Sequence, residues 1–80
     1  MTERDLYDEA SELTASLRRL GAEETAAGMK SAIEGGTTSS EILLALQWEL
    51  DRLFERGGTS DARVNQRAAE LRRAIDAAAR

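Results

Sequence analysis

Glycine divides this chain into four segments of helical length, and no proline interrupts any of them. Single or paired glycines stand at positions 21, 35–36 and 57–58, where a positive φ would end a helix at no steric cost. We therefore expect helices at about residues 3–20, 22–34, 39–56 and 60–79, joined by short loops of Gly, Thr and Ser. Loops this short imply antiparallel neighbours. The sequence predicts an all-α fold, a compact antiparallel bundle of four helices forming one domain over residues 1–80, and the alternative is an open dimer that exchanges the last helix.

Each segment carries an apolar stripe at helical spacing, which predicts the face that it buries. The stripes consist of Leu6, Ala10, Leu13, Leu17 and Leu20; of Ala22, Ala26, Met29 and Ile33; of Ile42, Leu43, Leu46, Leu50, Leu53 and Phe54; and of Val64, Ala68, Leu71, Ile75 and Ala78. Gly28 lies inside the expected helix at residues 22–34, where glycine is less favourable than alanine. We expect that its small size compensates by allowing a neighbouring helix to approach closely.

Hydroxyl residues mark the expected helix starts. Thr38 and Glu41 have the spacing of a capping box, in which the Thr hydroxyl accepts from the Glu41 N–H and the carboxylate accepts from the Thr38 N–H. Thr2 is a candidate N-cap for residues 3–20, and Thr59 and Ser60 supply a hydroxyl for residues 60–79.

Leu44 and Trp48 lie one turn apart on the side of residues 39–56 that faces away from the predicted core. If this helix is central, neighbouring helices cover both residues. If it is not, the pair is exposed and suits a protein partner, because Trp is enriched among interface hot spots. The sequence leaves these alternatives open.

The net charge of −4 is unevenly distributed. Acidic residues gather near the start (Asp5, Asp8, Glu9 and Glu12), and arginines are in excess near the end. In one interpretation the two charged faces attract each other within the bundle. In the other, the acidic face binds a basic protein, whose association it would speed. The acidic balance and the lack of aromatics among the arginines argue against nucleic acid as a partner.

The composition argues against catalysis. Without His or Cys the chain lacks the usual general base, thiolate nucleophile and preferred zinc ligands. Asp8 and Glu12 share a helix face, but we interpret them as solvated carboxylates. We therefore expect no enzyme activity, no catalytic residues, no metal and no cofactor. No apolar run of membrane-spanning length or signal peptide is visible, and the preference for Arg over Lys suggests a bacterial coding sequence, so we expect a cytoplasmic bacterial protein.

The run GGTTSSEILLALQWEL, preceded by LRRLGAEETAAGMKSAIE, resembles a group of short bacterial helical proteins without an assigned function. The resemblance covers residues 17–50 and implies no catalytic residues. By size and charge alone, the chain is similar to immunity proteins, which bind and silence a toxin.

These features predict a protein-binding module, an immunity- or antitoxin-like inhibitor, that is a monomer or weak homodimer. Its partner, a protein such as a toxin, would contact Leu44 and Trp48 or the acidic residues Asp5, Asp8, Glu9 and Glu12. The alternatives are a structural homodimer without a foreign partner and a transcriptional regulator.

Overall fold

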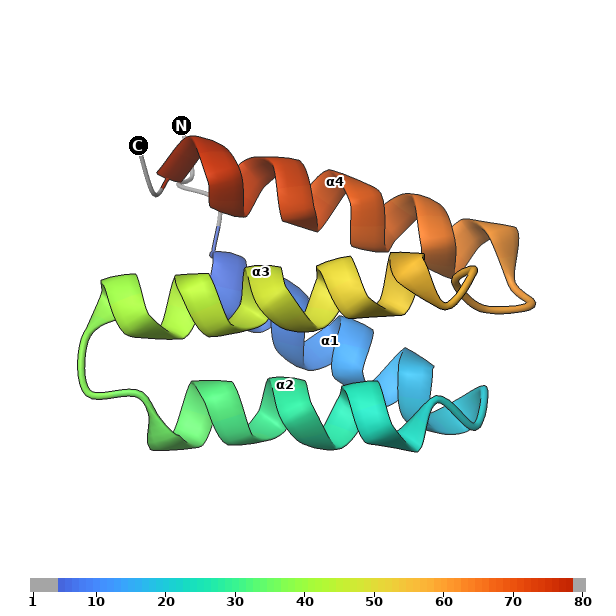
Figure 1. Ribbon diagram of the computed structural model, residues 1–80, viewed down its shortest axis with the longest axis horizontal. Coiled ribbons are helices and arrows are strands. Elements are labelled where there is room, and N and C mark those ends of the chain that lie inside the picture. The colour runs from blue at the N-terminus through green and yellow to red at the C-terminus, as the bar shows by residue number, and fades with distance from the viewer. Residues whose placement is uncertain (1–4, 79–80) are drawn as a thin grey trace.

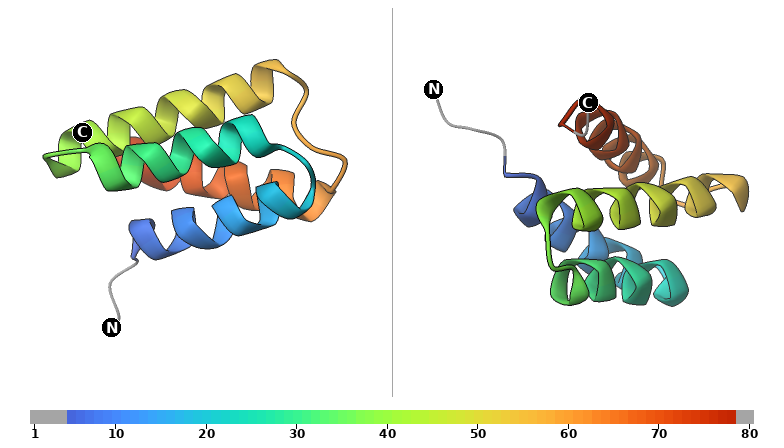
Figure 2. Two further views of the ribbon diagram at one scale, coloured as in Figure 1. Left: turned by 90° about the horizontal axis from the view of Figure 1, so that it is seen from below. Right: turned by 60° about the vertical axis from the view of Figure 1, so that its left-hand side comes forward.

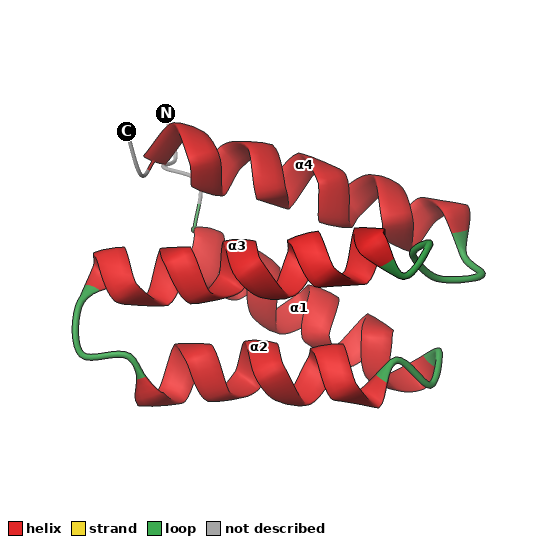
Figure 3. Cartoon of the chain, viewed as in Figure 1, coloured by secondary structure: helices red, strands yellow, loops and turns green. Residues whose placement is uncertain are grey.

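The computed structural model describes residues 5–78, which form four α-helices and no strand. They are α1 (Leu6–Arg19), α2 (Glu23–Gly35), α3 (Ser39–Glu55) and α4 (Ala62–Ala78). Successive helices run in opposite directions and are joined by short loops (Figures 1 and 3). Each helix packs mainly against two others: α1 and α3 both contact α2 and α4. The predicted compact antiparallel four-helix bundle is confirmed.

Helix α3 lies between α4 and α2, and α1 closes the bundle from behind (Figure 1). Seen from the side, α4 crosses α3 at a clear angle, whereas α2 runs more nearly along α3 (Figure 2). One side of α3 therefore points away from the rest of the bundle.

The core is built from the predicted stripes. Its buried members are Ala10, Leu13, Leu17, Ala26, Met29, Leu43, Leu46, Leu50, Leu53, Val64, Ala68, Leu71 and Ile75. Three predicted core residues are exposed: Leu20 by 38%, Phe54 by 36%, and Ala78. All three stand at the C-terminal end of a helix, where the neighbouring helices no longer cover the stripe.

Aspartates cap the first and last helices. The Asp5 carboxylate accepts from the backbone N–H groups of Tyr7 and Asp8 at 3.0 and 3.1 Å, so α1 begins at Leu6 and later than predicted. Thr2, the predicted cap, lies outside the described residues. At α4 the Asp61 carboxylate accepts from the N–H groups of Arg63 and Val64, so the prediction of a hydroxyl cap there is wrong.

The Thr59 hydroxyl instead stabilises the loop before α4. It donates to the Asn65 side-chain oxygen at 2.7 Å and accepts from the Asp61 N–H at 3.1 Å. Because Thr59 holds Asp61 in place, the loop presents an aspartate, not a hydroxyl, to the first turn of the helix.

Only one of the two hydrogen bonds of the predicted capping box forms at α3. The Thr38 hydroxyl accepts from the Glu41 N–H at 3.2 Å. The Glu41 carboxylate, however, accepts from the Thr37 hydroxyl at 2.7 Å and from the Thr37 N–H at 3.4 Å, not from Thr38. The carboxylate reaches back one residue further than predicted and holds the loop before the cap.

Positive φ values occur at Gly21, Gly57 and Gly58, as expected for helix ends. The same expectation is wrong for Gly35 and Gly36, since α2 continues through Gly35 and Gly36 has an extended conformation with φ −75°. A Cβ at Gly36 would meet the Ile42 side chain, so this glycine provides space and not a special backbone conformation.

Candidate protein-binding face

Leu44 and Trp48 are exposed, by 58% and 55% of their surfaces. The structure thus decides between the two interpretations of their burial: α2 and α4 flank α3 but do not cover this side. On the opposite side of the helix Leu43, Leu46 and Leu50 are buried. The exposed pair and its neighbours form what we call the α3 outer face. Its residues are Glu41, Leu44, Trp48, Asp51, Arg52 and Glu55.

Arg52 covers part of the Trp48 ring. Its guanidinium carbon lies 4.7 Å from the ring centroid, within range for a cation–π interaction. Arg52 also lies 3.6 Å from a carboxylate oxygen of Glu24, at the start of α2. The Trp48 side chain is therefore held on one side by an arginine that is itself positioned by a second helix.

Glu24 binds a second arginine more closely. Both of its oxygens accept from the Arg56 guanidinium, each at 3.0 Å. This pairing lowers the pKa of the Glu24 carboxyl, first through the hydrogen bonds and then through the charge of Arg56, and it raises the pKa of Arg56. The bidentate contact joins the start of α2 to the end of α3.

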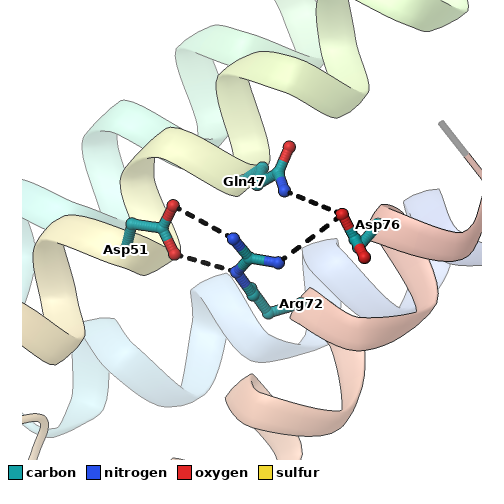
Figure 4. A network of polar contacts seen from close by, with 4 residues as sticks. All are labelled: Gln47, Asp51, Arg72 and Asp76. Carbon is teal, nitrogen blue, oxygen red and sulfur yellow. Dashed lines mark hydrogen bonds and ion pairs between the residues drawn. The ribbon is translucent and has the colours of Figure 1, made fainter. Parts of the chain in front are cut away.

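On the other edge of the α3 outer face, Arg72 of α4 binds Asp51 with two hydrogen bonds of 2.8 and 3.3 Å (Figure 4). Arg72 also lies 3.9 Å from Asp76, to which the Gln47 amide donates at 3.5 Å. In the opposite amide orientation the Gln47 oxygen accepts from two Arg72 nitrogens, each at 3.2 Å. The bidentate contact with Asp51 raises the pKa of Arg72 and fixes α3 against α4.

Glu49 turns from α3 toward α2. Its carboxylate lies against Gly28, where a Cβ would occupy the same space. Partial burial raises the pKa of this carboxyl. Gly28 therefore permits a close approach, as expected, but the group that approaches is a side chain and not a helix backbone.

Among the acidic residues at the start of the chain, Asp5 and Glu12 make structural contacts. Asp5 caps the helix, and its charge is the main reason that the pKa of the neighbouring Asp8 carboxyl is raised. Glu12 lies 3.6 Å from Arg67 of α4, which is the attraction between the two charged faces that one interpretation of the sequence expected. Glu9 is half-buried.

The two predicted sets of contact residues do not come together. Helix α1 lies behind α3 (Figure 1). Leu44 and Trp48 lie on the exposed side of α3, opposite its buried leucines. The acidic residues of α1 and the α3 outer face are therefore separate surfaces. Whether either one binds a partner stays a prediction.

Arg52 was missed by the sequence analysis, although a signal was present. It follows Trp48 by four residues, the spacing at which helical side chains meet. Glu41 and Glu55 were also not selected, although each is seven residues from Trp48 and shares its face.

Two surface hollows adjoin α1. One of about 230 Å³ lies between α1 and α2 and is lined by Ser11, Thr14, Lys30, Ile33 and Glu34. A shallower one of about 500 Å³ lies between α1 and α4 beside Arg18, Arg19 and Arg67. Among residues 5–78, no group of three acidic side chains is placed to hold a metal ion, and none of the helices in this range is long and apolar enough to cross a bilayer.

Comparisons of the chain with family models, with curated proteins and with solved structures found no match. The resemblance of residues 17–50 to short bacterial helical proteins gains no support from them. The interpretation of function therefore depends on the surface of the molecule itself.

Proposed function

We propose that this chain is a small protein-binding module and that the α3 outer face is its contact surface. The observation that carries this proposal is the exposure of Leu44 and Trp48, side by side, on a helix whose other leucines are largely buried. Neither residue helps to close the core, yet both keep large apolar groups in water. Covering such groups is the main source of affinity in protein interfaces, and Trp is prominent among hot spots.

The surroundings of Trp48 support the proposal. Arg52 stacks on its ring and Glu24 holds Arg52, so part of the side-chain entropy that binding would cost has already been lost. Asp51 is held in the same way by Arg72. A partner would therefore meet a preorganised surface with an apolar centre and a polar rim, which is the usual anatomy of an interface.

The acidic residues of α1 are weaker candidates for a contact surface. Asp5 and Glu12 already serve as a helix cap and as an ion-pair partner within the bundle. Binding through them would compete with contacts that hold α1.

Within this function we favour an inhibitor that binds and silences a protein, as immunity proteins and antitoxins do. The supporting feature is the net charge of −4, which would speed association with a basic target. The host would be bacterial and the location cytoplasmic.

The test is affinity capture from a lysate of the native host, analysed by mass spectrometry. Wild type is compared with Trp48→Arg and with Ala77→Arg, a matched control that adds the same charge at an exposed position of α4. Circular dichroism confirms that each variant is helical.

A stoichiometric partner that is retained by wild type and Ala77→Arg but lost by Trp48→Arg supports the proposal. A partner that Trp48→Arg retains would exclude the α3 outer face as the contact surface. Self-association without any foreign protein would instead identify a structural homodimer.

A further inference from the structure

Two exposed glutamates, Glu41 and Glu55, lie on the same face of α3 as Trp48 and at equal distances from it along the helix. Glu41 precedes Trp48 by seven residues and Glu55 follows it by seven. Seven residues are about 10.5 Å of helix at 1.5 Å per residue, and each step of seven turns the side chain by only about 20°. The apolar centre of the α3 outer face is thus flanked by one negative charge about two turns away on each side.

These two charges are not neutralised within the bundle. Asp51 is paired with Arg72. Arg52 and Arg56 share the single carboxylate of Glu24, at 3.6 and 3.0 Å. Among residues 5–78, no Lys or Arg forms an ion pair with Glu41 or Glu55. Glu41 accepts hydrogen bonds from Thr37, but these leave its charge in place.

Glu55 has no evident value for folding. It stands in the last turn of α3, where the negative end of the helix dipole repels a carboxylate. Its side chain is exposed and buries no apolar surface against the core. A carboxylate at this position therefore disfavours the helix slightly. A role in binding a partner at the α3 outer face would account for it better than a role in folding.

A second copy of the chain is a poor occupant of this face. In a two-fold dimer with antiparallel α3 helices crossing at Trp48, Glu41 of each copy would face Glu55 of the other. With parallel α3 helices, each glutamate would face its own equivalent. Because a two-fold interface pairs the same patch with itself, both arrangements oppose like charges.

We infer that the α3 outer face receives a basic amphipathic helix of a partner protein. The helix would place an apolar side chain against Trp48 and Leu44, with a Lys or Arg about two turns away on each side, opposite Glu41 and Glu55. This inference rests on the proposed function and adds the chemistry of the partner to it. An apolar helix face laid on an apolar surface, with charges that set its register, is a common mode of recognition.

Three synthetic peptides test this charge pattern. Each is alanine-based and about 20 residues long, so that it is helical in water. The first carries central leucines with Lys seven residues to either side, and the second carries Glu in place of Lys. The third has the composition of the first with the lysines moved to the opposite helix face. Trp48 is the only Trp, so its fluorescence reports binding at this face.

We expect the first peptide to bind about tenfold more tightly than the other two at low ionic strength, because each exposed ion pair contributes a factor of a few. Glu55→Lys should weaken the first peptide several-fold and strengthen the second. Glu34→Lys, the matched control on α2, should change neither affinity, because Glu34 is exposed outside the α3 outer face.

Three results would overturn the inference: equal affinities for the three peptides, no binding by any of them, or a wild-type dimer in sedimentation that Trp48→Arg abolishes. If the host partner is captured through Trp48 but the peptides show no preference for the first pattern, the inference fails and the proposed function stands. If the pattern is preferred but no Trp48-dependent partner exists in the host, the proposed function fails, and the inference that rests on it fails as well.

Discussion

Two glycines of this chain should respond in opposite ways to the same substitution. Gly28 lies inside α2, and a methyl group there would meet the carboxylate of Glu49. Gly36 lies just after α2, and a methyl group there would meet Cγ1 of Ile42 as well as the Ala32 carbonyl oxygen at 3.1 Å. The two obstacles differ in how easily they can move.

The end of the Glu49 side chain is flexible and only partly buried, and burial raises the pKa of its carboxyl. Turning it outward would restore its hydration, so the obstacle costs little. Alanine is favoured over glycine inside a helix by about 0.8–1.0 kcal/mol. We therefore expect Gly28→Ala to raise the free energy of unfolding by about 0.5–1 kcal/mol, most of the propensity gain.

Ile42 is β-branched, stands in the first turn of α3 and packs against the core. It has essentially one favoured χ1 rotamer there, so it cannot turn away from a methyl group at Gly36. Alanine fits the Gly36 backbone and would gain about 0.4–1 kcal/mol through the unfolded chain. Overpacking typically costs about 1–3 kcal/mol. The net expectation for Gly36→Ala is a loss of about 1–2 kcal/mol.

Urea unfolding followed by circular dichroism measures both variants, and the melting temperature should move by about 4–8 °C per kcal/mol in a domain of this size. Gly28→Ala should also be measured in a Glu49→Ala background, where the full propensity gain should appear. If Gly28→Ala destabilises wild type but not the Glu49→Ala background, the carboxylate is fixed in place and the reasoning is wrong. Shifts of the same sign for both glycines would refute it as well.

Other consequences follow from single contacts. Asp61→Ala should cost about 0.5–2 kcal/mol in urea unfolding because it removes the cap of α4, whereas Ser60→Ala should cost less than about 0.5 kcal/mol. Leu46→Ala, at a fully buried position, should cost about 2.7–5 kcal/mol, enough to leave part of the chain unfolded at 37 °C by circular dichroism. Because Arg56 lowers the pKa of Glu24 below its ordinary 4.5, this pair stabilises the fold above that pH, and its contribution is lost as the pH falls through the lowered pKa. Glu24→Gln should therefore melt below wild type at pH 7, and the two melting curves should converge near the acid limit.

The helices and the buried stripes could be predicted because both follow from spacing along one segment. Leu13, Leu17, Leu71 and Ile75 repeat every three or four residues, and this period alone specifies which side is buried. Leu20 and Phe54 follow the same period but are exposed. The spacing of apolar residues does not reveal where the neighbouring helix ends. The end of that neighbour decides whether the last apolar residue of a stripe is buried.

The helix starts were harder to predict because several suitable residues compete. Thr59, Ser60 and Asp61 can each cap a helix, and the choice of Asp61 depends on how the Thr59 hydroxyl holds the loop. Gly36 was misread for a related reason. A glycine that provides space for Ile42, six positions later in the chain, looks the same in a sequence as a glycine that ends a helix.

The exposure of Trp48 could not be predicted because it depends on the number of helices around α3. Three neighbours would have covered it, but α2 and α4 leave one side open. The charge pattern around it was available in the sequence. Glu41, Trp48 and Glu55 share one spacing, but the spacing has meaning only once the residue at its centre is known to be exposed.

Each helix of the bundle packs mainly against two others, and this arrangement has a consequence for folding during synthesis of the chain. Three of the four main interfaces join helices that are consecutive in the chain, and the fourth joins α1 to α4. Such local contacts favour rapid folding. The α1–α4 interface must nevertheless wait until residues 62–78 exist, which at roughly 5–20 residues per second is a delay of about 3–12 s after α1 is made. During that interval the side of α1 that α4 will cover has no permanent neighbour, so its apolar residues stay open to aggregation until α4 is complete.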